Sequence, residues 1–121
     1  MTSFQLEALA DAQVFPKCEN FERVGTFKFR GAYHTIAQSM SSRPAHVVAT
    51  FSSANYAQGL ALACRLQGAA AHVVMPNPFS ATKHRAVLGY GAQVHGVEDR
   101  NCTDARCATS WMIIYGRCLL V

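Results

Sequence analysis

Apolar runs rich in β-branched residues alternate with helix-like stretches through the middle of this 121-residue chain. The runs at 46–51, 71–75 and 92–97 are typical of buried strands, and the stretches at 56–67 and 80–88 are typical of helices. Neighbouring parallel strands need a long return path, which a helix supplies. The alternation therefore predicts an α/β fold in which an open parallel sheet lies in three layers with flanking helices.

One more helix is predicted at residues 26–40, because apolar and small residues recur there at helical spacing and Thr26 can cap the first turn. Gly68 is the expected C-terminal cap of the helix at 56–67. Ser80 is the expected N-terminal cap of the helix that follows the second strand.

The two ends of the chain carry weaker patterns. Residues 1–10 form a short polar-apolar lead-in, and residues 12–18 are typical of a short strand in which Pro16 favours a sheet edge or a strand start. After Val97 the periodicity decays. The apolar run at 111–121 fits either a docking strand or a sequence that lacks its native partner.

Composition and charge argue against several classes of protein. Half of the residues are apolar, which is enough for a core, and the net charge of +4 is scattered without a basic block, which argues against nucleic acid or a membrane as partner. The five cysteines are odd in number and follow no signal-like segment, so we expect reduced thiols and a cytoplasmic location. Neither histidines nor cysteines have ligand spacing, so no metal site is expected.

Lys28 is the first candidate for a catalytic residue. It lies just inside the predicted helix start, and Phe27 and Phe29 are expected to shield its amine from water. An amine attacks a carbonyl carbon only in its unprotonated form, which such shielding favours. The alternative is a surface lysine in a first helical turn, which is the more common case for a lysine taken alone.

The loop after the first predicted strand is a candidate ligand-binding site. Ser52, Ser53 and Asn55 lie at the carboxyl end of that strand, where open α/β sheets bind ligands. Backbone N–H groups of a helix start and two hydroxyls can hold an anion there, such as a substrate carboxylate. An ordinary N-terminal cap in a turn of small residues would use the same side chains.

Together the two segments resemble the serine/threonine dehydratase and serine racemase family of pyridoxal-phosphate enzymes, of fold type II, which is tryptophan synthase beta-like. The sequence Gly-Thr-Phe-Lys-Phe-Arg-Gly at 25–31 looks like the family's cofactor-attachment segment. The sequence Ser-Ser-Ala-Asn-Tyr-Ala-Gln at 52–58 is similar to its substrate loop, usually Ser-Ser-Gly-Asn-His-Ala/Gly-Gln. The likeness extends from Gln13 to Val97 in the same order and spacing.

The resemblance implies a cofactor and a set of roles. Pyridoxal 5'-phosphate would be carried by Lys28 as an imine, with Asn55 contacting its ring oxygen. The substrate carboxylate would be held by Ser52, Ser53, Asn55 and the backbone through Tyr56, and Ser53 would act as an acid or base on the face opposite Lys28.

The reaction implied by the resemblance is that of an L-serine/L-threonine ammonia-lyase, a dehydratase that forms a 2-oxo acid and ammonia. A serine racemase-like activity is the alternative. The expected partners are a small amino-acid substrate and a second subunit, either as a homodimer or through pairing with a full-length subunit.

Departures from the family pattern predict an incomplete version of its fold. Ala54 replaces a glycine, which costs about 1 kcal/mol where φ is positive, and Tyr56 replaces a histidine. The family's glycine-rich phosphate loop has no counterpart in this chain. We therefore expect a truncated chain with three parts: at 1–25 a lead-in and edge strand of an otherwise missing large domain, at 26–97 a small α/β domain with the lysine and substrate loop, and at 98–121 a divergent tail.

Two functions of other classes remain open from the residues. A catalytically silent product could bind a full-length subunit, or a generic nucleotide-binding module could use Lys28 and the loop at 52–55 to contact phosphate.

Overall fold

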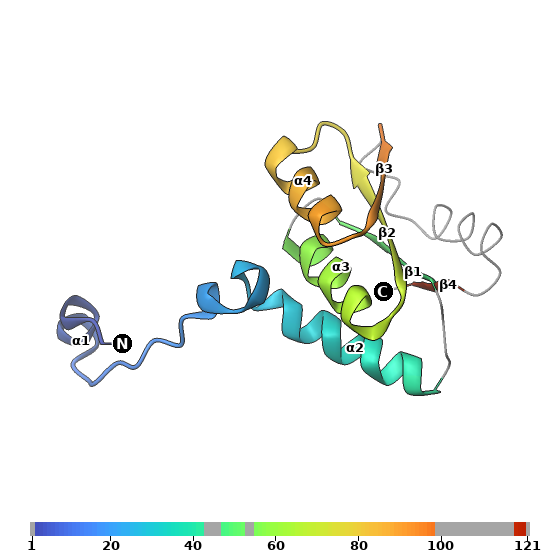
Figure 1. Cartoon of the computed structure of the whole chain (residues 1–121). Coiled ribbons are helices and arrows are strands. Elements are labelled where there is room, and N and C mark those ends of the chain that lie inside the picture. The colour runs from blue at the N-terminus through green and yellow to red at the C-terminus, as the bar shows by residue number, and fades with distance from the viewer. Residues whose placement is uncertain (1, 43–46, 53–54, 99–117, 121) are drawn as a thin grey trace.

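The computed structural model describes residues 2–42, 47–52, 55–98 and 118–120 (Figure 1). The four strands in that part of the chain are β1 (Val47–Phe51), β2 (Ala70–Pro76), β3 (Gln93–Val97) and β4 (Cys118–Leu120). The α-helices there are α1 (Phe4–Ala10), α2 (Lys28–Ser42), α3 (Asn55–Gln67) and α4 (Ala81–Gly89). Two short 3-10 helices, Glu19–Phe21 and Arg23–Gly25, precede α2.

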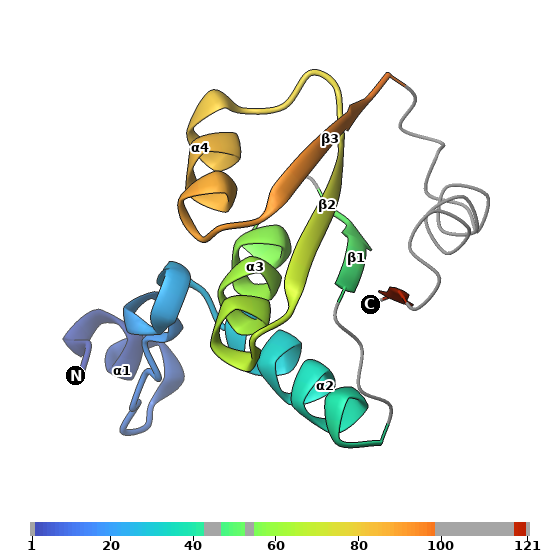
Figure 2. The same cartoon turned by 45° about the vertical axis from the view of Figure 1, so that its right-hand side comes forward.

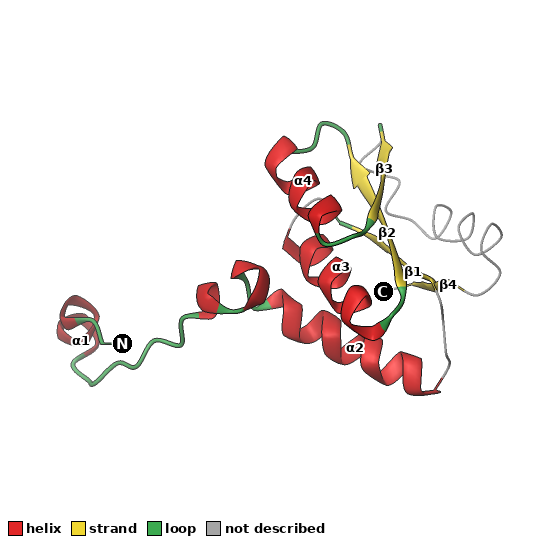
Figure 3. Ribbon diagram, viewed as in Figure 1, coloured by secondary structure: helices red, strands yellow, loops and turns green. Residues whose placement is uncertain are grey.

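The described strands form one parallel sheet in the order β3-β2-β1-β4. In its register Val47 lies beside Ala70, and His72 lies beside Gln93. The crossover helices α3 and α4 lie on the same side of the sheet, and α2 packs on the outer side of α3 (Figures 1 and 3). The predicted open parallel sheet with flanking helices is confirmed.

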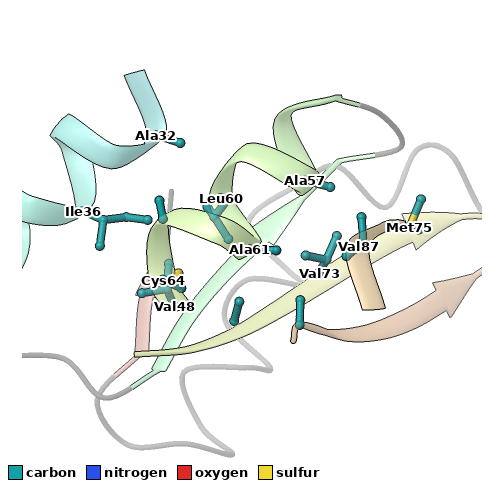
Figure 4. Packing of buried hydrophobic residues seen from close by; sticks show 13 residues of the cluster. Ala32, Ile36, Val48, Ala57, Leu60, Ala61, Cys64, Val73, Met75 and Val87 are labelled. Carbon is teal, nitrogen blue, oxygen red and sulfur yellow. The ribbon is translucent and has the colours of Figure 1, made fainter. Parts of the chain in front are cut away.

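The core lies between the sheet and α3. Almost every residue of β2 is buried, as expected for an inner strand of a parallel sheet, and β2 lies between β1 and β3. Small residues of α3 allow α2 to approach closely, and Figure 4 shows Ala32 and Ile36 pointing from α2 toward α3. The cluster comprises Ala32, Ile36, Val48, Ala57, Leu60, Ala61, Ala63, Cys64, Ala71, Val73, Met75, Val87 and Ala92.

Most predicted helix ends are confirmed. Thr26 is extended, and its Oγ1 accepts a hydrogen bond from the backbone N–H of Lys28 at 3.4 Å. Gly68 ends α3 with a φ of 72°, a left-handed conformation that glycine adopts without strain. Ser80 does occupy the N-cap position of α4, but its side chain makes no capping hydrogen bond.

One prediction for the amino-terminal part was wrong, and one helix there was not anticipated. The lead-in at residues 1–10 contains α1, whose first turn is capped by Ser3 Oγ accepting from the N–H of Leu6 at 3.4 Å. Residues 13–18 are not a strand, because the segment runs away from the sheet and Pro16 has no N–H to donate to a neighbour (Figure 2). The apolar alternation at 12–18 therefore has no ladder partner among the described residues.

The tail contributes a strand. Residues 118–120 pair with β1 in parallel, with Cys118 beside Val47 and Leu120 beside Ala49. Of the two readings of the apolar run at 111–121, this pairing agrees with a docking strand. Residues 99–117 lie outside the described part of the chain.

Candidate functional site

The predicted substrate loop lies at the carboxyl edge of the sheet. Ser52 directly follows β1, and its N–H donates to the carbonyl oxygen of Val74 in β2 at 3.0 Å. Asn55 begins α3 and is exposed. The loop therefore opens where the strands end, as expected for a ligand site in an open α/β sheet.

The packing of α2 on α3 brings Lys28 next to this loop. A Cβ atom added at Gly59 of α3 would lie 3.4 Å from the carbonyl carbon of Lys28, so the two backbones are in close contact. Asn55 precedes Gly59 by four residues, which corresponds to about 6 Å along a helix axis. The backbone of Lys28 thus contacts α3 one helical turn after Asn55, although Lys28 and Asn55 belong to different elements.

The side chain of Lys28 is exposed and has no salt bridge within the described residues. The described salt bridges join Glu19 to two other cations: its Oε1 lies 2.7 Å from Arg30 Nη2 and 3.1 Å from Lys17 Nζ. Lys28 is therefore open to a carbonyl compound that approaches from solvent.

The predicted shielding of Lys28 by both flanking phenylalanines was wrong. Phe27 is 58% exposed, and Phe29 packs against the core with its ring centroid 5.7 Å from that of Tyr33. Phe27 precedes α2, and Phe29 points about 100° away from Lys28 around the helix, so neither ring covers the Lys28 side chain.

The remaining loop residues have different surroundings. Ser52 is half-buried, and Tyr56 packs half-buried against the core, where burial raises the pKa of its hydroxyl, with a smaller contribution from Cys64. The Tyr56 side chain therefore serves the core as a neutral phenol. Ser53 and Ala54 lie outside the described residues, so the acid/base role of Ser53 stays a prediction.

Gly59 is the site residue that the sequence analysis missed. An isolated glycine inside a helical stretch lowers helix propensity, and it commonly marks a close approach of another backbone. That signal was present in the stretch at 56–67 and would have indicated Gly59.

Other polar features lie away from this edge. On β2 and β3, His72 Nδ1 and His95 Nε2 are 3.1 Å apart with stacked rings. A shallow hollow of about 270 Å³ beside Arg65 and Tyr90 lies at the opposite, amino-terminal edge of the strands. No group of three His, Cys, Asp or Glu within the described residues is placed to hold a metal ion. None of the described helices has the length and apolar character needed to span a bilayer.

A family model and curated relatives both match this chain. Residues 1–111 match the family described as "Pyridoxal-phosphate dependent enzyme". The chain is 51% identical over 94 residues to an L-threo-3-hydroxyaspartate ammonia-lyase from Pseudomonas sp, covering 77% of this chain and 29% of that protein. It is 45% identical over 83 residues to the serine racemase of Schizosaccharomyces pombe, covering 69% of this chain and 26% of that protein.

Solved structures agree with these matches. Maize serine racemase superposes with a TM-score of 0.88 at 30% identity, covering 100% of this chain and 36% of that chain. The chain thus spans less than a third of the length of the curated relatives that it matches.

Proposed function

Since the chain belongs to the family of pyridoxal-phosphate dependent enzymes, we propose that residues 26–97 form the part of an amino-acid ammonia-lyase that carries the cofactor lysine and the substrate loop. Ammonia-lyases and racemases are both among its relatives. The observation that carries the proposal is the close contact of the Lys28 backbone with Gly59 of α3, one helical turn after Asn55, together with the exposure of both Lys28 and Asn55.

The donor set fits the ring end of pyridoxal phosphate. Lys28 supplies an accessible primary amine for the cofactor's aldehyde carbon, and Asn55 supplies an amide N–H for the ring oxygen. The phosphate end differs, because the sequence contains no glycine-rich run to surround it. We therefore expect this chain to hold the cofactor through its ring and aldehyde, with weak affinity.

The chain's own residues divide the chemistry between them. When bound, the cofactor supplies an electron sink for the charge that develops at the substrate Cα. The Lys28 amine, once released to the substrate side, accepts the Cα proton as the Cα–H bond breaks. In this proposal Ser52, Asn55 and the backbone through Tyr56 orient the carboxylate, and the acid or base on the opposite side of the substrate is assigned to Ser53, which lies outside the described residues.

The proposed substrates are 2-amino-3-hydroxy acids, with L-serine and L-threonine as the expected pair. Breakage of the Cβ–O bond expels the hydroxyl group as water, and hydrolysis of the eliminated product gives a 2-oxo acid and ammonia. The Pseudomonas relative is named for L-threo-3-hydroxyaspartate, which belongs to the same chemical class. Return of a proton from the Ser53 side would instead invert Cα, as a racemase does.

Covalent labelling tests the role of Lys28. The chain contains three lysines, Lys17, Lys28 and Lys83, so peptide mass spectrometry after incubation with pyridoxal phosphate and borohydride can assign every label. We expect the label to concentrate on Lys28, to disappear from that peptide in Lys28→Arg and to persist in the control Lys83→Arg. Equal labelling of the three lysines would reject the proposal for this chain.

Product analysis separates the two activities. The chain is incubated with pyridoxal phosphate and L-serine, L-threonine or L-threo-3-hydroxyaspartate, and the 2-oxo acid and the D-amino acid are measured. Formation of 2-oxo acid that Lys28→Arg abolishes supports the lyase. D-serine without 2-oxo acid would favour the racemase.

A second candidate function is favoured by the amino-terminal arm, residues 2–21. Phe4 and Leu9 of α1 are each 85% exposed, Phe15 is 73% exposed and Phe21 is 75% exposed. Large apolar side chains that stay exposed along one segment favour a protein-binding role for that segment. We propose that this arm docks onto a full-length subunit of the same family.

Size-exclusion chromatography with light scattering tests the docking. The chain is mixed with the full-length Pseudomonas ammonia-lyase, and a mixed species is expected with the wild-type chain but not with Phe4→Ser/Leu9→Ser. Absence of any mixed species with the wild-type chain would reject this second function.

A further inference from the structure

Gly59 lies where α3 comes closest to the first turn of α2. A Cβ atom there would be 3.1 Å from both the Cα and the backbone nitrogen of Phe29, and 3.4 Å from the carbonyl carbon of Lys28. All three neighbours are backbone atoms, so no side-chain rotation could make room. A methyl group at position 59 would have to push the first turn of α2 away by a few tenths of an ångström.

The other glycines within described helices lack this constraint. A Cβ atom at Gly31 in α2, or at Gly89 in α4, would meet nothing within 4 Å. Alanine is the better helix former at any interior position, so a glycine in α3 sacrifices helix propensity. At Gly59 the lower helix propensity occurs at the position where α3 contacts the backbone of Lys28 and Phe29.

We propose that Gly59 is a positioning residue of the candidate site: the missing side chain sets how closely the Lys28 backbone rests on α3. Asn55 lies on the same helix four residues earlier, so this contact also sets the separation between the Lys28 amine and the Asn55 amide. The inference rests on the proposed function, because it takes Lys28 as the cofactor-bearing amine.

The test compares Gly59→Ala with Gly89→Ala, a matched glycine-to-alanine change in open space. Both chains are labelled with pyridoxal phosphate and borohydride, and the ratio of label on Lys28 to label on Lys17 is measured. Because a displacement of 1 Å can reduce a reaction rate about 100-fold, we expect Gly59→Ala to lower the ratio about tenfold and Gly89→Ala to change it less than about twofold. An unchanged ratio in a folded Gly59→Ala chain would overturn the inference, even if its stability falls.

A second readout needs no cofactor. In amide NMR spectra of the uniformly labelled chain, Gly59→Ala should shift the Lys28 and Phe29 signals more than those of β3, whereas Gly89→Ala should leave both signals in place. Trimethylamine N-oxide, which is excluded from protein surfaces, keeps a marginal variant folded for this measurement. Unshifted Lys28 and Phe29 signals would refute the positioning role.

The two readouts separate the inference from the proposed function. If the wild-type chain shows no preference for Lys28 in labelling, the proposed function fails for this chain. The NMR comparison still decides whether Gly59 sets the place of the Lys28 backbone.

Discussion

At the scale of single residues, two nucleophilic side chains of the chain differ in their exposure to solvent. Lys28 is exposed at the start of α2, whereas Cys64 is fully buried in α3. Burial raises the pKa of the Cys64 thiol to about 12, because the thiolate would lose its hydration in the core. Only the first of these groups can react with a solute in the folded chain.

Cys64 should therefore resist alkylation until the chain unfolds. With iodoacetamide at pH 8, peptide mass spectrometry should find Cys18, which is half-buried, modified in the folded chain and Cys64 unmodified. In urea both should react. Modification of Cys64 at the rate of Cys18 without urea would contradict the packing of α3.

Val24 is a residue-scale feature that the sequence analysis did not anticipate. Its φ of 61° places a β-branched residue in the left-handed region, and Gly25 follows with a φ of 67°. Such a conformation is unfavourable for valine, by about 1–2 kcal/mol. The turn before Lys28 is thus held by its surroundings rather than by local preference.

At the scale of elements, α3 connects the site to the core. Its amino-terminal end carries Asn55, its outer side contacts α2, and its inner side packs on the sheet. Leu60 lies in the middle of this helix with no exposed surface. Loss of its side chain would leave a cavity between the helix layer and the sheet.

We expect Leu60→Ala to lower the free energy of unfolding by about 2–5 kcal/mol, because it removes buried methyl groups and leaves a cavity. The matched control is Leu66→Ala on the same helix, where the side chain is 48% exposed, and its effect should be within about 0.5 kcal/mol. Urea unfolding followed by circular dichroism measures both. Equal effects of the two substitutions would contradict the observed packing.

The contact between β2 and β3 predicts a pH dependence. The pKa values of His72 and His95 lie below the ordinary value of 6.5 because both rings are desolvated, and His95 also disfavours charge on His72. As pH falls through 6.5, the unfolded chain takes up protons that the folded chain does not. The free energy of unfolding should therefore decrease from pH 7.5 to 5.5.

Urea unfolding across that pH interval checks the sign. His95→Gln should flatten the dependence, whereas His34→Gln, which alters an exposed ring of α2, should preserve it. A free energy of unfolding that increases as pH falls to 5.5 would show that the pair is not held neutral in the folded chain.

At the scale of the whole molecule, the arm and the sheet are separate in structure. The arm consists of α1, the loop that follows it and the 3-10 helix Glu19–Phe21, and α1 has no buried residue. Figures 1 and 2 show that the arm lies beyond the start of α2, away from the strands. The division at residues 25 and 26 and the larger domain of which 1–25 would be a part both stay predictions, and the 3-10 helix Arg23–Gly25 contacts α3.

Deletion of residues 1–11 should leave the folded sheet intact. The expected change in the free energy of unfolding is within about 0.5 kcal/mol, because the removed helix buries nothing. Under the docking proposal the same deletion should abolish binding to a full-length subunit. A large loss of stability in the isolated chain would mean that the arm packs on the sheet in solution.

The sequence by itself determined the parallel α/β fold, because buried strands and amphipathic helices have different periods and each was present in the local pattern. It also indicated Lys28 and Asn55, since both lie in short segments whose residue types are visible without a structure. It could not give the strand pairing of residues 118–120, which depends on a partner strand far away in the chain.

Tertiary structure alone decided the exposure of Phe27, the absence of a strand at 13–18 and the contact of Gly59 with the Lys28 backbone. The physical reason is common to all three. A local pattern records which side chains prefer burial, whereas the neighbour that buries a residue or pairs with it comes from a distant part of the chain.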